Sequence, residues 1–167
     1  MTYRPDEAGA GGADFSGGVR FTDGVTECTS KSLGVVFGEG AKPGSREMRQ
    51  VTATGDVVVK GEKMDAKADI LVYGYPPGET LTSATLTAKP GETVEVRQGD
   101  LFCKAERVDM VETPGKGNKN AMRAKAFGTG YIKYQSAARA DAVAPDRPFE
   151  VHFTQSGTFD DAALQSV

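Results

Sequence analysis

The alternation of apolar and polar residues constrains this chain most, because it recurs about every 37 residues along the sequence. Each recurrence begins at or beside a glycine, in segments that start at residues 17, 54, 91 and 128. Apolar side chains then occupy every second position, a short polar turn follows, and a second alternating run returns. Successive residues of a β-strand face opposite sides of the sheet, so each unit is typical of a hairpin with one apolar face.

Glycine and proline mark the connections between these runs. The 167 residues include 21 Gly and 8 Pro, which gather at 38–45, 74–78, 114–120 and 145–148. Only 38% of the residues are hydrophobic. Many turns and a modest apolar fraction favour short or half-exposed strands over a helical bundle, and the length suits one domain.

Three glycines, Gly55, Gly91 and Gly130, lie within the long first strand of a unit. Glycine inside a strand usually marks a bulge or a sharp bend, and a bend at one place in every unit would fold each strand across two sheet faces. We therefore predict an all-β fold with almost no helix: a repetitive antiparallel jelly roll or V-shaped sandwich of about four 37-residue hairpin units. The alternative is an ordinary sandwich whose strands resemble one another by accident.

The pattern also sets the expected boundaries. A single repetitive β domain is predicted at 18–155, with a flexible N-terminal tail at 1–17 and a C-terminal tail at 156–167. Strands are predicted at about residues 47–60, 63–73, 82–98, 100–111, 121–135 and 149–155. Val57 shares parity with Val59, Val94 and Ile132, so Val57 is predicted to be buried and Val58 to face the opposite side of the sheet.

The sequence contains no recognisable catalytic, metal-binding or cofactor motif. His152, the only histidine, alternates with Val151 and Phe153, as expected of a surface or edge position. The glycine-rich runs match no phosphate-binding fingerprint. The net charge of -3, with both signs interspersed, points away from nucleic acid, and no apolar run is long enough to predict a membrane span. We therefore expect a protein that is not an enzyme and that uses no cofactor and no metal.

Cys28 and Cys103 occupy equivalent places in the first and third units. With two strands in each unit, strand spacing puts equivalent residues two units apart at about 19 Å. A disulfide tolerates a Cα separation of only about 7 Å. Both cysteines are therefore predicted to be reduced and unpaired, acting as small apolar residues on the inner face.

Residues 51–59 with 64–69, and the return strand at 99–107, resemble the repeat of the OstA-like lipopolysaccharide-transport family. The resemblance covers about residues 46–134. It implies a periplasmic β-jellyroll that holds lipid acyl chains in an apolar groove and passes lipid along by stacking end to end through open edge strands. The chain departs from the family at 30–32, where Ser-Lys-Ser replaces an expected acidic pair, and at 139–142, where the match is weak.

The inward-facing stripe is the candidate lipid-binding site. Small side chains among its members favour space for a ligand, but a closed core of mutually packed side chains explains the same alternation, and both interpretations remain open. The candidate residues are Val57, Val59, Met64, Ala66, Ala68, Leu71, Val94, Val96, Leu101, Ala105 and Val108.

From the pattern and the resemblance together we expect a non-enzymatic lipid-binding or lipid-transport β-jellyroll of a diderm bacterial envelope, located in the periplasm or cell envelope. Its expected partners are a lipid or lipopolysaccharide, and a second copy or a related β-jellyroll joined through edge strands. No nucleic acid and no membrane-spanning segment are expected. The alternative is a structural or interaction module that self-assembles or docks through β-strand edges.

Overall fold

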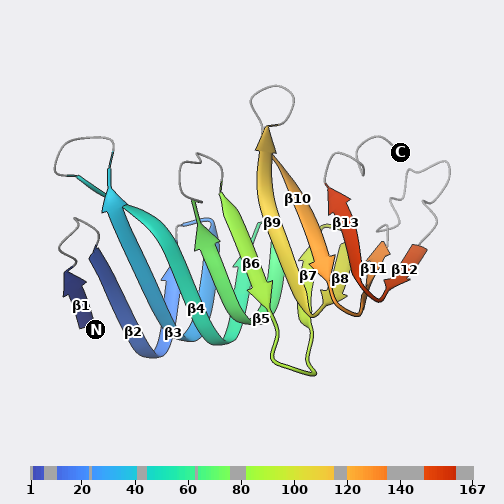
Figure 1. The fold of residues 1–167 in the computed structure, drawn as a ribbon, viewed down its shortest axis with the longest axis horizontal. Coiled ribbons are helices and arrows are strands. Elements are labelled where there is room, and N and C mark those ends of the chain that lie inside the picture. Colours follow the sequence, from blue (N-terminus) through green and yellow to red (C-terminus); the bar gives the residue numbers. More distant parts are fainter. Residues whose placement is uncertain are drawn as a thin grey trace.

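The computed structural model of the chain describes residues 2–5, 11–22, 24–40, 45–62, 64–75, 82–114, 120–134 and 149–160. In these residues the protein is all-β: one 13-stranded antiparallel sheet, without helices (Figure 1). The strands are β1 (Thr2–Pro5), β2 (Gly11–Thr22), β3 (Thr26–Glu39), β4 (Arg46–Gly61), β5 (Met64–Gly74), β6 (Ser83–Thr87), β7 (Val94–Gln98), β8 (Leu101–Ala105), β9 (Arg107–Pro114), β10 (Asn120–Phe127), β11 (Gly130–Tyr134), β12 (Phe149–Phe153) and β13 (Ser156–Asp160).

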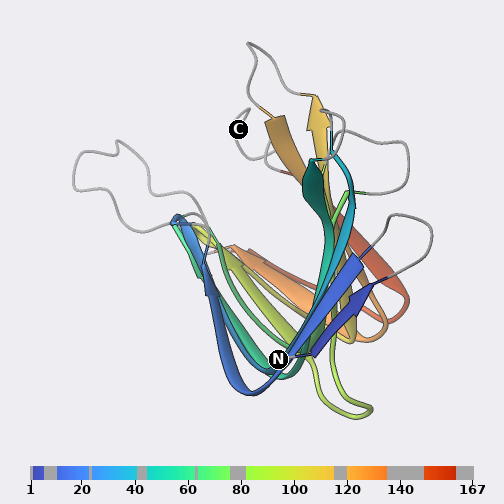
Figure 2. The same cartoon turned by 90° about the vertical axis from the view of Figure 1, so that its left-hand side faces the viewer.

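The sheet folds into two arms that meet along a line of bends, which Figure 2 shows as a V. Strands β2 to β5 run through both arms, and their pairing shifts register where they cross, as between Thr54 and Val57 of β4. They give residues 11–16, 32–39, 46–54 and 70–74 to arm 1 and residues 19–22, 26–29, 57–61 and 64–68 to arm 2. After β5, separate strands extend each arm: β6, β9, β10 and β13 in arm 1, and β7, β8, β11 and β12 in arm 2.

Left-handed backbone conformations mark the line of bends. Gly55 in β4 has a φ of 80°, and Gly91, in the turn from β6 to β7, has a φ of 82°, a region that glycine enters without steric cost. Both glycines were predicted bend positions. The third prediction, Gly130, is wrong by two residues: Gly128 has the positive φ of 82°, and Gly130 begins β11. A side chain at position 128 would collide with that of Glu106.

The bends divide three of the predicted strands. The range 82–98 contains β6 and β7, 100–111 contains β8 and most of β9, and 121–135 contains most of β10 and all of β11. Apolar alternation continues on both sides of each bend, so the sequence pattern does not reveal where the chain passes from one arm to the other.

Strands also occupy parts of both predicted tails, so the domain extends beyond 18–155. β1 pairs with the start of β2, and residues 11–16 of β2 pair with β3. At the other end, β13 pairs with β10. Residues 11–18 and 156–158 consist mostly of glycine and other small residues, which weaken the alternation on which the prediction depends.

The inner faces of both arms form one hydrophobic core. Val57 and Val59 are 1% and 5% exposed, whereas Val58 is only half-buried. Val94 and Ile132 are buried as well, so the predicted parity of the strands is confirmed. Alternation alone was sufficient for this result, because each side chain in a strand faces the side opposite to its neighbours.

Candidate functional site

An apolar cavity of about 240 Å³ lies between the inner faces of the two arms. Arm 2 contributes side chains from β2 to β5, and arm 1 contributes side chains from β4, β5, β6, β9 and β10 together with Thr82, which precedes β6. The lining residues are Phe21, Thr26, Cys28, Val59 and Met64 of arm 2, and Val51, Leu71, Tyr73, Thr82, Ala84, Leu86, Met110, Glu112 and Met122 of arm 1.

The bend side of the V is tightly closed. Next to the bends, Val57, Val94, Ala105 and Val108 are at most 1% exposed. The cavity lies farther from the bends, beside the next residues along the same inner faces, such as Val59 and Met110. The inward stripe is therefore a closed core beside the bends, and it borders open apolar space toward the open end of the V, its mouth.

Three of the eleven predicted site residues, Val59, Met64 and Leu71, line this cavity. The other eight are not among its lining residues and belong to the core beside it. All eight lie on the predicted inner face: seven are buried, and Ala68 is partly buried against the core. These eight are Val57, Ala66, Ala68, Val94, Val96, Leu101, Ala105 and Val108.

Sequence reasoning missed most of the arm 1 lining, including Val51, Tyr73 and Met122. Their strands carry the same alternation, so their inward parity was available from the sequence. Alternation does not indicate which inward residues of one arm face which inward residues of the other arm. That pairing depends on how the two arms face each other, which is a property of the folded sheet.

One inner row runs across arm 2 and contains both cysteines. Cys28 is opposite Val59, Val59 is opposite Ala66, Ala66 is opposite Val96, and Val96 is opposite Cys103. Four strand spacings separate the cysteines by about 19 Å. Both are free and buried, so the predicted absence of a disulfide between them is confirmed.

Burial also determines the chemistry of the two thiols. It raises the pKa of Cys28 and raises that of Cys103 to about 12, because an apolar environment disfavours the charged thiolate. A protonated thiol is a poor nucleophile. The two cysteines therefore act as apolar lining and core residues.

Glu112 is the charged side chain of the cavity lining, the other lining residues being apolar, hydroxyl-bearing or Cys28. It follows Val108 and Met110 on the inner face of β9, so it lies farther from the bends than they do. Its Oε2 accepts a hydrogen bond from the Thr82 backbone N–H at 3.0 Å, and its own N–H donates to the Thr82 carbonyl at 3.0 Å. The first bond holds the carboxylate at the outer part of the cavity, and the second, between backbone groups, holds the strand segment that carries it.

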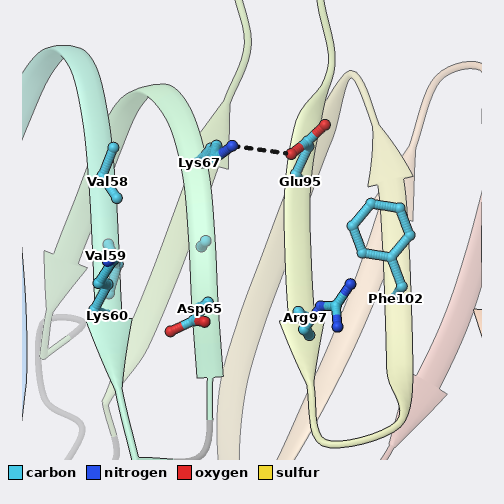
Figure 3. Close-up of a pocket in the computed structure, with 9 residues that line it drawn as sticks. Val58, Val59, Lys60, Asp65, Lys67, Glu95, Arg97 and Phe102 are labelled. Carbon is cyan, nitrogen blue, oxygen red and sulfur yellow. Dashed lines mark ion pairs between the residues drawn. The ribbon is translucent and has the colours of Figure 1, made fainter.

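The outer face of arm 2 carries a shallow hollow of about 220 Å³ with charged walls (Figure 3). Glu95 pairs with Lys67 at 3.7 Å, drawn in Figure 3, and with Lys104 at 2.7 Å. Hydrogen bonding to Lys104 lowers the pKa of Glu95, and the same contact raises the pKa of Lys104. Arg97 and Lys104 both lie over the Phe102 ring. These mutually paired charges are typical of a solvated sheet surface.

His152 lies on β12, which pairs with β11 at the end of arm 2. Its side chain is 72% exposed, and Nε2 is 2.8 Å from Glu150 Oε1. The predicted edge position is confirmed. In the described part of the chain, no group of three or more His, Cys, Asp or Glu side chains is arranged to hold a metal ion, and no helix is long and apolar enough to cross a membrane.

The ends of arm 2 are open edges among the described strands. β12 pairs with β11 alone, and residues 19–22 of β2 pair with β3 alone. Phe149 and Val151 of β12 are 46% and 53% exposed. Val151 is opposite the buried Ile132, so the apolar inner face continues to the end of the sheet and becomes exposed there.

Comparison of the chain with family models, with curated proteins and with solved structures gave no match.

Proposed function

We propose that this protein is a non-enzymatic lipid-binding protein that holds an acyl chain in the cavity between its two arms. The observation that carries the proposal is the apolar space beside Val59, Met64 and Met110, lined from both arms. Water gains few hydrogen bonds in such a space, and an alkyl chain that enters it leaves water entirely.

The volume of the cavity sets the size of the ligand. A cavity of about 150 Å³ accepts benzene, so 240 Å³ accommodates about ten carbon atoms. At about 0.8 kcal/mol for each buried CH₂, ten carbons gain about 8 kcal/mol before the cost of association is subtracted. That gain supports reversible binding of one chain segment.

We also propose that the all-β sheet is a β-jellyroll of the OstA-like type. The bent antiparallel sheet, with long strands that cross both arms, supports an OstA-like β-jellyroll built from about four hairpin units. The sequence resemblance supports a role in lipid transport at the periplasmic side of a bacterial envelope.

A pair of neighbouring substitutions tests the proposal. Ala84 lines the cavity, whereas Thr85 faces the other side of β6. Ala84→Phe fills the cavity and should weaken binding of a fluorescent decyl-chain probe at least tenfold. Thr85→Phe adds the same ring to the outer face and should leave the affinity unchanged. Equal affinity in the wild type and both folded variants would place binding elsewhere and refute the proposal.

The exposed edge of β12 favours a second function, docking through strand edges. Unpaired strand edges accept another strand, and Phe149 and Val151 add exposed apolar surface beside this one. A second copy or a related β-jellyroll is the proposed partner. Light scattering should then show concentration-dependent oligomers that Val151→Lys reduces. If the protein is a monomer at all concentrations and mass spectrometry detects co-purified lipid, docking is refuted and lipid binding remains as the proposed function.

A further inference from the structure

We propose that the cavity selects a single alkyl chain whose head group donates hydrogen bonds and carries no negative charge. This inference rests on the proposed acyl-chain binding and adds the class of ligand. It follows from the position of Glu112, the charged side chain among the described lining residues, at the outer part of an otherwise uncharged cavity.

The Glu112 carboxylate is positioned to receive such a head group. The Thr82 N–H satisfies one site on Oε2. A carboxylate offers about four lone-pair sites on its two oxygens, so this bond leaves capacity for a donor on the ligand. The reciprocal Thr82 contact fixes the strand segment that carries the carboxylate, so binding need not order it.

The described lining of the cavity carries no positively charged side chain. Besides Glu112, the polar lining side chains are Thr26, Thr82 and Tyr73, all of which are uncharged at neutral pH. An anionic head group would meet the carboxylate across apolar walls, where charges interact more strongly than in water. An ammonium head group would gain from the same field.

A second acidic side chain lies in a hollow that adjoins the cavity. Thr26 and Met64 of the cavity also line an adjoining hollow of about 220 Å³, together with Val25, Gly61 and Glu62. Glu62 is exposed in the turn between β4 and β5. Glu112 therefore borders the cavity from arm 1, and Glu62 borders the adjoining hollow in arm 2. Acidic side chains in these two places favour a cationic or neutral donor over a phosphate or carboxylate.

The test uses the whole protein and three ligands with the same ten-carbon chain: decylammonium, decanol and decanoate. Titration calorimetry at neutral pH should give the tightest binding for decylammonium and the weakest for decanoate, with about a tenfold difference between the two. Glu112→Gln should remove most of that difference, because its amide oxygen still accepts the Thr82 bond but carries no charge. Glu112→Lys should reverse the order.

Glu92→Gln is the matched control, since Glu92 lies in the exposed turn between β6 and β7; it should keep the wild-type order. Equal affinities for the three ligands in the wild type, or an unchanged order in a folded Glu112→Gln protein, would refute the head-group inference while leaving chain binding intact. Failure of all three ligands to bind the wild type would instead refute the proposed function.

Discussion

The two ends of the V are built from the same alternating sequence pattern, yet they pack differently. Beside the bends, Val94 and Val108 are fully buried, and the arms close on each other. Toward the mouth, Met64 and Met122 are only partly buried and border a cavity. The arms diverge with distance from the bends, so side chains of similar size fill the space at one end and leave it open at the other. Distance from the bend, rather than hydrophobicity, therefore separates core from site.

The largest expected effect is at the closed end. Val57→Asp places a carboxylate at a position that is 1% exposed and should unfold or severely destabilise the domain, because an unpaired buried carboxylate costs several kcal/mol. Val58→Asp, on the other face of β4, should be tolerated. Urea unfolding of both variants measures the difference. Similar losses would show that both faces of this strand are covered.

Truncation of one side chain at each end sharpens the comparison. Val108 is 0% exposed and does not line the cavity, so Val108→Ala should cost about 2 kcal/mol of unfolding free energy. Met64 is partly buried beside existing space, and Met64→Ala should cost less than about 1 kcal/mol. Denaturant melts of the two variants provide the test. Equal costs would mean that the mouth is packed as tightly as the bend side.

The pH dependence of the unfolding free energy tests whether the Cys103 thiol is buried. The pKa of Cys103 is raised to about 12 in the folded protein, above its ordinary value of 9.0. Its stabilising contribution is therefore fully present below pH 9 and is lost as the pH rises toward 12, because only the unfolded chain ionises in that interval. Cys103→Ala should flatten this part of a stability–pH curve. The same decline in the variant would assign it to other groups.

The reactivity of the two thiols gives a separate test of their burial. Two thiols should react readily after denaturation, and none should react readily in the native protein, since both cysteines are buried. No reactive thiol in either condition would indicate a disulfide and contradict the observed register.

The smallest effect is expected on the convex side of the bends, where exposed charges form a chain. Lys31 pairs with Asp56 at 2.8 Å, and Lys89 lies 3.6 Å from Asp56 and 3.4 Å from Asp69. The Lys31 hydrogen bond lowers the pKa of Asp56, so this contribution is present at neutral pH and is lost as the pH falls through that lowered value. Lys89→Ala should barely change the melting temperature, because exposed ion pairs contribute little. A large decrease in melting temperature would show that the charged groups at the bends, rather than the core, provide much of the stability.

Much of this arrangement was accessible from the sequence. Alternation placed Val57 and Val94 on the buried face and Val58 on the other, and the glycine in the first strand of the second unit located the bend at Gly55. The division of the later strands was not accessible, because alternation resumes with the correct parity after each bend.

The cavity itself was predicted only in part. Val59 was included among the candidates, but Glu112 was not, although its parity with Met110 places it on the inner face. An acidic residue at an inward position of an alternating strand was the available signal. The role of that residue depends on the cavity, which forms only where the two arms of the folded sheet face each other.

Methionine methyl resonances offer the most direct test of the central claim that a chain binds between the arms at the mouth. Met64, Met110 and Met122 line the cavity, whereas Met48 packs against the core without lining it. In a protein labelled with ¹³C at the methionine methyl groups, titration with decylammonium should shift the first three signals and leave that of Met48 in place. Shifts confined to Met48, or none at saturating ligand, would contradict the account.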